Sequence, residues 1–318
     1  MNNVLNLILR RLLVLPIMVL GVTFLVFFLM SFSNIDPAYS ALGEGSSAEA
    51  RAAYRETHGL NDPWLTRFLS FLAGMVQGDL GTYGTRQVSV ADRVFEAFPV
   101  TLELTFIGLA LAVVIALPLG VLAALYRDKW PDQVIRVASI IFIATPSFWL
   151  AVLLILAFSA NLGMFPASGQ LPSFFDDPGG YVDRMIMPAF ALAVPVAGSL
   201  IRIVRTSMVE ELDKDYVRTA LGAGIAKPVV IGRNVLRNAL ITPVTVMGLR
   251  IGYLMGGAVV IEVIFNLPGM GVTILQGIQQ NHPDLVQGVV LIVALAFIVI
   301  NIIVDLLYLL INPRIRAV

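Results

Sequence analysis

The residue types from which enzymes build active sites are scarce in this chain. It has no cysteine, which excludes disulfides, thiolate nucleophiles and cysteine-ligated metal sites. None of its three lysines (Lys129, Lys214 and Lys227) follows a glycine, so the sequence holds no phosphate-binding GK[ST] loop. His58 and His282 stand alone, and the motifs H-E-x-x-H and G-x-S-x-G do not occur. We therefore expect no catalytic residue, no metal site and no cofactor bound by this chain itself.

Five ionisable residues lie within or beside long apolar runs. A charged group in the middle of a bilayer costs at least about 2.5 kcal/mol, so such residues usually face the interior of a helix bundle and have partners. Arg202 and Asp305 lie at similar distances, about six and about seven residues, from the inner ends of their expected membrane spans, which predicts a structural ion pair. A proton-relay role is the alternative. The five residues are Glu103, Arg202, Arg250, Glu262 and Asp305.

Arg250 lies about 11 residues into its run, near the middle of the membrane, and no acidic residue of this chain is evident at its depth. It is our first candidate for lining a transport pathway, where it would meet a substrate carboxylate or an acidic residue of a partner chain. Helix packing is the alternative role for Arg250. Glu262 is the second pathway candidate.

The composition of the chain is that of a membrane protein. Hydrophobic residues make up 58% of its 318 residues, charged residues only 13%, and the mean hydropathy is +0.87. Ordinary soluble domains carry roughly a quarter charged residues. A core of this size could not hide so much apolar surface from water, so we expect lipid to be the main solvent. The net charge of zero gives no indication of nucleic-acid binding.

Apolar runs predict an all-α integral membrane fold with six transmembrane helices. Each run supplies most of the roughly 20 residues that cross the hydrocarbon of a bilayer. Arg10 and Arg11 precede the first run as in a signal peptide. That run is longer than the roughly 7–15 apolar residues of a signal peptide, and no A-x-A-like cleavage site follows it. We therefore expect it to be a first transmembrane span that is retained in the protein. The runs are Leu12–Ile35, Leu104–Tyr126, the start of Val137–Phe175, Met185–Ile201, Ala239–Ile261 and Leu285–Val304.

The distribution of lysine and arginine predicts the topology. These residues gather in alternate connections, and the short outer loops hold only Arg184, which places both termini on the cytoplasmic side. We expect residues 1–35 to contain the first span and residues 36–98 to form an extracytoplasmic segment. A five-helix core follows over residues 99–312, with a cytoplasmic tail over residues 313–318.

The extracytoplasmic segment contains a predicted amphipathic helix. Asp62 and Pro63 are typical of an N-cap and a first helical position, and Gly78 or Gly81 is expected to end the helix. We interpret it as a cap on the bundle at the outer interface, anchored by Trp64; a gate or a docking ledge is the alternative. The apolar residues at helical spacing are Phe68, Leu69, Leu72, Met75 and Val76.

The connection over residues 206–243 has the features of a docking element. A polar stretch over residues 210–215 leads into a short helix that lies across the inner face of the membrane, and Gly224 is expected to stop it. We expect Tyr216 and Val217 to be exposed, where they would suit the groove of a partner better than water. An ordinary cytoplasmic loop is the alternative.

This connection resembles the coupling loop of ATP-binding-cassette importer permeases. The resemblance is strongest to the B-type permease subunit of dipeptide, oligopeptide and nickel importers, and it extends in order through nearly the whole chain. Its central stretch is Tyr216-Val217-Arg218-Thr219-Ala220, then Gly224, then Leu236–Ile241. The other matching stretches are Gly78–Thr82, Pro99–Leu104, Thr145–Leu150, Phe165–Gly169, Gly256–Glu262, Pro268–Gly271, Val304–Tyr308 and Asn312–Arg316.

The resemblance implies a permease subunit that is not itself an enzyme. It would form half of a translocation pathway for di- or oligopeptides in a bacterial-type cytoplasmic (inner) membrane. The implied partners are a homologous second permease, two cytoplasmic ATPase subunits that use ATP and Mg, and an extracytoplasmic solute-binding protein. The central stretch, with Tyr216, Val217, Arg218, Thr219, Ala220 and Gly224, would sit in a cleft of an ATPase subunit.

Two features depart from the family pattern. Gly222 and Ala223 precede the coupling-loop glycine, where family members commonly have basic residues, and this difference concerns the contact with the ATPase. Arg250 stands where they tend to have an uncharged polar residue, and this difference concerns the substrate. The alternative function is an ion- or proton-coupled secondary transporter. Such a transporter would need an intramembrane acid on the pathway and no ATPase partner.

Overall fold

The computed structural model describes residues 2–32, 35–43 and 45–311, with side chains from residue 13 to residue 304. The predicted tail, residues 313–318, lies outside these ranges. Within them the chain is almost entirely helical, and its one small sheet pairs Thr82 with Ser89 and Tyr83 with Val88 in antiparallel register. The elements are α1 (Asn2–Met30), α2 (Pro37–Leu42), α3 (Ala48–Thr57), α4 (Trp64–Gln77), β1 (Thr82–Tyr83), β2 (Val88–Ser89), α5 (Val90–Leu125), α6 (Trp130–Ala144), α7 (Ser147–Leu154), η1 (Ile155–Asn161), α8 (Pro178–Leu212), α9 (Asp215–Gly222), α10 (Lys227–Val229), η2 (Val230–Val235), α11 (Leu236–Ala239), α12 (Ile241–Phe265), α13 (Met270–Gln279) and α14 (Pro283–Ile311).

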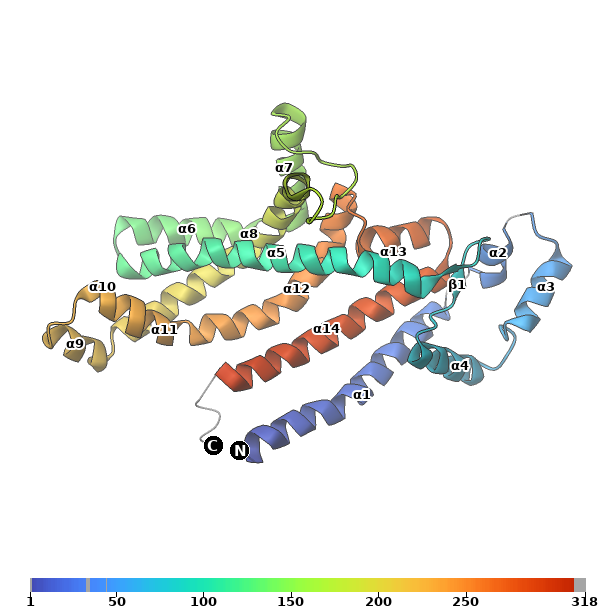
Figure 1. The fold of residues 1–318 in the computed structure, drawn as a ribbon, viewed down its shortest axis with the longest axis horizontal. Helices are drawn as coiled ribbons and strands as arrows, with labels where there is room; N and C mark the ends of the chain where they lie inside the picture. Colours follow the sequence, from blue (N-terminus) through green and yellow to red (C-terminus); the bar gives the residue numbers. More distant parts are fainter. Residues whose placement is uncertain (1, 33–34, 44, 312–318) are drawn as a thin grey trace.

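The described chain contains five helices that are long and apolar enough to cross a membrane: α1, α5, α8, α12 and α14. The bent pair of α6 with α7 and η1 makes a sixth span if it is counted as one, so the six-helix expectation is confirmed in this form. Figure 1 shows α9–α11 at one end of the bundle, here called the α9 end. The opposite end, here called the α4 end, carries α2–α4 and the hairpin.

The third span is sharply bent. α6 ends at Ala144 and α7 begins at Ser147, and the two parts of the span meet at 97°. The backbone of Thr145 is extended at the break (φ −81°, ψ 115°). Pro146 causes the bend, because it has no N–H to donate to a helical hydrogen bond and its ring disfavours helical backbone in the preceding residue. α7 therefore projects from the side of the bundle (Figure 1).

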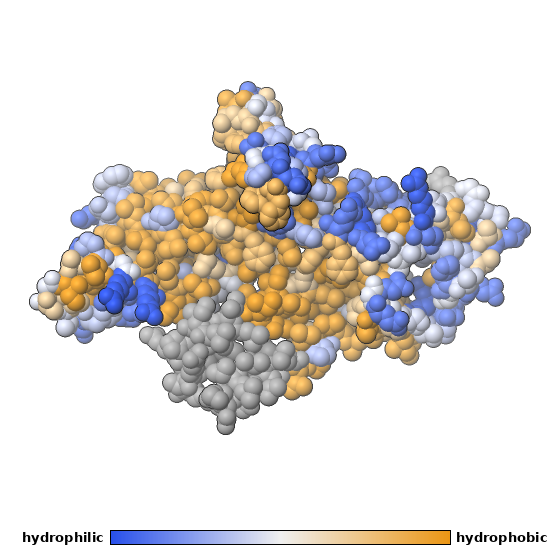
Figure 2. All heavy atoms as spheres, viewed as in Figure 1, coloured by the Kyte–Doolittle hydropathy of each residue, from blue (hydrophilic) through white to orange (hydrophobic). Residues whose placement is uncertain are grey.

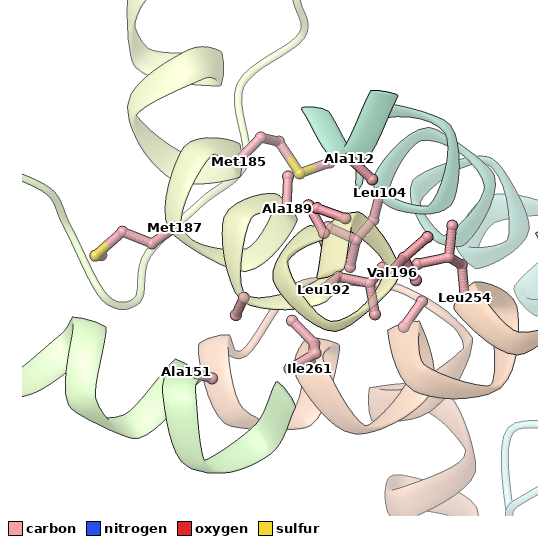
Figure 3. Close-up of a cluster of buried hydrophobic side chains, with 14 of the residues drawn as sticks. Leu104, Ala112, Ala151, Met185, Met187, Ala189, Leu192, Val196, Leu254 and Ile261 are labelled. Carbon is pink, nitrogen blue, oxygen red and sulfur yellow. The ribbon is translucent and has the colours of Figure 1, made fainter. Parts of the chain in front are cut away.

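α8 is the central helix of the bundle. Of its span, 67% is buried, against 28% for each of α5 and α12. Small residues let the neighbouring backbones approach: a Cβ on Gly120 would lie 2.7 Å from Val204, and one on Gly198 would lie 2.7 Å from the carbonyl oxygen of Ser139. The side chains that pack around α8 in Figure 3 come from α5 (Leu104, Ala112), α7 (Ala151) and α12 (Leu254, Ile261).

The outer surface of the bundle is apolar. Large side chains such as Ile17, Val114 and Val137 are more than half exposed. Figure 2 shows a hydrophobic band across the middle of the molecule, with hydrophilic residues gathered at the two ends. Such a band is stable against lipid but not against water, so it is the surface of a multi-pass membrane protein.

The predicted amphipathic helix is α4, at the α4 end. It begins at Trp64 with Pro63 as N-cap, one residue later than expected, and Asp62 makes no capping bond. Gly78 ends it in the left-handed conformation (φ 81°), as predicted. Trp64 packs its ring against Phe24, Phe27, Phe28 and Phe68 at centroid distances of 5.5–6.3 Å. The helix is therefore fastened to α1 through aromatic contacts.

Candidate transport pathway and coupling segment

The coupling segment, residues 213–240, connects α8 to α12 at the α9 end. α9 starts after a two-residue turn, and Glu211 at the end of α8 holds it in place. The ammonium group of Lys214 contacts Oε2 of Glu211, and the Tyr216 hydroxyl donates to Oε1 at 2.9 Å. Burial raises the pKa of Tyr216, so its hydroxyl keeps the proton that it donates. The start of α9 is thus fixed to the end of α8.

Val217 is buried, with 5% of its surface exposed, and it belongs to a hydrophobic cluster that includes Met208 of α8 and Ala239 of α11. The expectation that Val217 is exposed is wrong. α9 lies against α8 and against the returning part of the segment, so its apolar stripe faces inward. Among the other predicted coupling residues, Arg218, Thr219 and Gly224 are exposed, whereas Tyr216 and Ala220 are half-buried.

Gly224 stops the helix, as expected. Its φ of +80° lies in the left-handed region, which glycine enters without steric cost. The amide of Gly224 donates to the carbonyl oxygen of Leu221 at 3.0 Å, and that of Ile225 donates to Ala220 at 3.2 Å. These bonds satisfy the last carbonyls of α9 and reverse the chain towards α10.

Three apolar side chains at the end of α9 and in the segment after it are exposed. Leu221, Ile225 and Val229, here called the apolar ridge, are 41%, 43% and 49% exposed. They were not among the predicted docking residues, although their recurrence at every fourth position is a signal that the sequence carries. Exposed hydrophobic residues gathered outside the hydrocarbon are typical of a protein interface. The ridge, rather than Val217, is therefore the part of the segment that a partner can cover.

A cavity of about 560 Å³ lies between α6, α8 and α12 on the α9 side of the bundle. Its walls combine charged, hydroxyl and apolar side chains, in contrast to the apolar core beside it. Arg250 and Arg202 both line this cavity. The lining residues are Ile143, Ser199, Arg202, Ile203, Thr206, Ser207, Glu210, Thr242 and Arg250.

The two arginines lie at similar distances from the ends of their own helices. Arg202 is ten residues before the end of α8 at Leu212, and Arg250 is nine residues after the start of α12 at Ile241. At about 1.5 Å per residue, each is about 14–15 Å from its helix terminus at the α9 end. Neither guanidinium has a hydrogen-bond or ion-pair partner among the described side chains. The side chain of Asp305 lies outside the described part of the chain, so the predicted pair of Asp305 with Arg202 stays a prediction.

A different ion pair fixes α6 to α8. Asp132, which is fully buried, accepts hydrogen bonds from Nε (2.6 Å) and Nη2 (2.7 Å) of Arg205, and its Oδ2 accepts the amide of Asp128 at 2.9 Å. The sequence itself indicates no partner for Arg205. The sequence carries only a weak signal for the pair of Asp132 with Arg205, because the pairing depends on how α6 packs against α8.

Glu262, the second pathway candidate, does not line the cavity. It is fully buried near the other end of α12, where its Oε2 accepts the amide of Gly271 at 2.6 Å. Thr101 Oγ1 accepts the neighbouring amide of Met270 at 3.0 Å. Together they satisfy two free N–H groups at the start of α13, which has no side-chain cap of its own. Glu262 therefore stabilises the start of α13 and does not line the cavity.

Two further charged residues make local contacts near the start of α8. Glu103, which is exposed, accepts a hydrogen bond from the Tyr181 hydroxyl at 2.7 Å. Arg184 belongs to α8 instead of an outer loop, and it is buried. Its guanidinium donates to the carbonyl oxygens of Gly169 (3.0 Å) and Phe265 (3.3 Å). Arg184 thereby holds the loop before α8 against the end of α12.

Comparison with known proteins identifies the family. Residues 116–317 match the model of the binding-protein-dependent transport system inner membrane component, and residues 4–105 match that of its N-terminal part. The chain belongs to this family. It is a permease of the dipeptide and oligopeptide branch of ATP-binding-cassette importers, as the names of its relatives also indicate.

The permease is similar to curated relatives along nearly its whole length. A Brucella abortus protein assigned as a peptide transport system permease is 37% identical and covers 95% of both chains. The glutathione transport system permease of Escherichia coli is 36% identical over 98% of this chain and 99% of its own. An Escherichia coli protein assigned as a D,D-dipeptide transport system permease is 35% identical over 95% and 94%.

A solved structure shares the fold of the permease. The crystal structure of an amino acid ABC transporter with histidines aligns with a TM-score of 0.51 at 16% identity, covering 70% of this permease and 94% of that chain. At this identity the likeness concerns the fold alone.

Proposed function

We propose that this permease forms half of the translocation pathway of an ATP-driven importer for di- or oligopeptides. Its partners would be a homologous second permease, two ATPase subunits and a solute-binding protein. The relatives named for peptide, glutathione and D,D-dipeptide transport support peptides as the class of cargo. The permease itself would bind no nucleotide; ATP and Mg would be used by the ATPase subunits.

The α9 end is the cytoplasmic end in this proposal, in a bacterial-type inner membrane with both termini in the cytoplasm. Basic residues gather there, and loops rich in lysine and arginine stay on the cytoplasmic side of membranes. The basic residues of the α9 end are Arg127, Lys129, Arg205, Lys214, Arg218, Lys227, Arg233 and Arg237. The α4 end, with α2–α4 and the hairpin, would then receive the solute-binding protein.

One structural connection carries the proposal: α8 bears both the coupling segment and the cavity. Glu211 holds α9 at the end of α8, and the residues of α8 from Ser199 to Glu210 line the cavity in the preceding three turns. A displacement of the apolar ridge by ATPase subunits would therefore move one wall of the cavity. Such a lever converts closure of the ATPase subunits into a change of access to the pathway.

Reconstitution of the complete importer in proteoliposomes tests the proposal. Uptake of a radiolabelled tripeptide should require the solute-binding protein on the outside and ATP at the α9 end. Hydrolysis-deficient ATPase subunits are the matched control and should abolish uptake. Uptake that is driven by an ion gradient in the absence of the ATPase subunits would contradict the proposal and favour a secondary transporter.

A further inference from the structure

We propose that the cavity between α6, α8 and α12 holds a short zwitterionic peptide, with its carboxylate at Arg202 and Arg250 and its amino group at Glu210. This inference rests on the proposed function, because it takes the cargo to be a peptide and the α9 end to be cytoplasmic. It adds a binding site, a polarity and a range of lengths for the cargo.

The charges of the cavity are ordered along its length. Arg202 and Arg250 lie about 14–15 Å along their helices from the helix ends at the α9 end, and this part of the cavity is here called its deep end. Glu210 lies only two residues before the end of α8, so it stands at the mouth. The cavity is therefore positive at its deep end and negative at its mouth, which matches a peptide whose carboxylate enters the deep end.

The spacing of these charges sets the length of the peptide. Arg202 and Glu210 are eight residues apart on α8, about 12 Å along the axis. An extended chain advances about 3.3–3.6 Å per residue, so this gap corresponds to three or four residues, and fewer when the long side chains lean towards each other. The volume of about 560 Å³ lies within the range of about 300–1,000 Å³ that is typical of small-molecule sites.

The walls between the charges offer hydrogen bonds to a peptide backbone. The hydroxyl groups of Thr206 and Thr242 line the cavity and make no hydrogen bond to the described residues. Thr242 stands one residue after the start of α12, so it faces the mouth together with Glu210. A peptide in the proposed orientation would place its amide groups between these hydroxyls.

The free guanidinium groups supply the attraction for the carboxylate. An unpaired charge away from bulk water is costly, and a carboxylate relieves that cost through charge-assisted hydrogen bonds. Because the pair of arginines lacks an acidic partner among the described side chains, the carboxylate of the cargo meets no competing acid within that part of the chain. The peptide would leave amino end first, past Glu210 and into the cytoplasm.

Import of a peptide and its C-terminal amide by the complete reconstituted importer tests this site. We would measure initial rates for trialanine and trialanine amide with the wild type, the double variant Arg202→Gln/Arg250→Gln and the matched control Arg202→Lys/Arg250→Lys. The same solute-binding protein serves all three, so its own preference cancels when the acid-to-amide rate ratios are compared. The ratio should fall about tenfold in the Gln variant, equivalent to about 1.4 kcal/mol, and change less than about twofold in the Lys variant.

A second arm tests the polarity of the site. Glu210→Gln should lower the ratio of the rates for free trialanine and N-acetyl-trialanine, and leave the acid-to-amide ratio within about twofold of the wild type. If the double Gln variant fails to assemble, the single variants Arg202→Gln and Arg250→Gln are measured in the same way. Each should lower the acid-to-amide ratio about threefold.

The outcomes separate this inference from the proposed function. If the wild type imports neither peptide, both are wrong. If the wild type imports peptides and the acid-to-amide ratio is the same in the Gln variants, the importer function stands and the carboxylate site is wrong. An unchanged ratio with loss of co-purified anionic lipid from the Gln variant would assign the arginines to a lipid phosphate and likewise overturn the site.

Discussion

Arg205 of α8 holds Asp132 of α6 through two parallel hydrogen bonds, from Nε at 2.6 Å and Nη2 at 2.7 Å. The carboxylate is fully buried and 18% of the arginine side chain is exposed. Arg202 lies three residues earlier on the same helix, on the cavity and without such a partner among the described side chains. α8 thus uses one arginine to fix a neighbouring helix and leaves the other on the cavity.

Arg205→Gln should destabilise the permease by on the order of 3 kcal/mol, because it leaves the buried carboxylate of Asp132 with only its longer ion pair to Arg136 (3.7 Å). Thermal unfolding in detergent measures the effect. The matched control is Arg127→Gln, which removes the exposed pair with Asp213 (2.9 Å) and should cost less than about 1 kcal/mol. Equal losses of unfolding free energy in the two variants would show that the buried pair stabilises the permease no more than the exposed pair does.

The apolar ridge should be the main contact with the ATPase subunits. Leu221→Asp or Ile225→Asp places a charge in that interface and should abolish co-purification of the ATPase subunits while the permease stays folded. Val217→Asp should instead unfold the coupling segment, because Val217 is buried in it. Pull-down of the ATPase subunits together with hydrogen exchange of residues 215–240 separates the two effects. ATPase binding that survives the ridge substitutions would refute the assignment.

Substitution by alanine should destabilise the coupling segment at Gly224 and stabilise it at Gly222. Gly224→Ala forces a Cβ into the left-handed region at a cost of roughly 1–2 kcal/mol, so the turn after α9 should open more often. Gly222 is the last helical residue of α9 and a Cβ there meets open space, so Gly222→Ala should stabilise the segment by up to roughly 1 kcal/mol. Hydrogen exchange of residues 215–225 measures both. Unchanged or slower exchange in Gly224→Ala would contradict the assignment of Gly224 as the helix stop.

The topology has a direct test in reporter fusions. A reporter fused after Pro313 should be cytoplasmic, and one inserted near Gly179, in the first turn of α8, should be extracytoplasmic. The reason is that an odd number of spans separates the two sites in the six-span arrangement, with the bent α6–α7–η1 pair counted as one. A fusion after Gly45, which precedes α3, serves as a second extracytoplasmic marker. Activity of the reporters on one common side would contradict the arrangement.

The contact between α2 and the turn before α14 should weaken in acid. Ser40 Oγ lies 2.6 Å from Nδ1 of His282, and burial lowers the pKa of His282 from its usual 6.5. The released ring therefore binds a proton more readily than the packed ring, so the contact keeps its stability above about pH 6.5 and loses it as the pH falls below that value. Hydrogen exchange of residues 38–43, corrected for intrinsic rates, should rise between pH 7.5 and pH 5.5. His282→Gln removes the titrating group and should abolish the dependence.

The sequence determined the class of the protein and most of its helices. Apolar runs of about 20 residues have one stable solution in lipid, the α-helix, because its backbone hydrogen bonds are satisfied within the run. For the same reason the glycine stop at Gly224 and the end of α4 at Gly78 were predictable: both depend on local backbone conformation. The family was also readable, because many short matches in one order define it.

Tertiary structure decided which side chains meet. Val217 was expected at the surface, yet α9 folds back on α8 and η2 and buries it, while Leu221 and Ile225 take the exposed places. Likewise, the partner of Arg205 is Asp132, 73 residues away in sequence, and no local pattern connects the two. The shared cavity of Arg202 and Arg250 arises only where α8 and α12 pack side by side at the α9 end. Local backbone preferences act over a few residues, whereas such contacts depend on the packing of helices that are far apart in the chain.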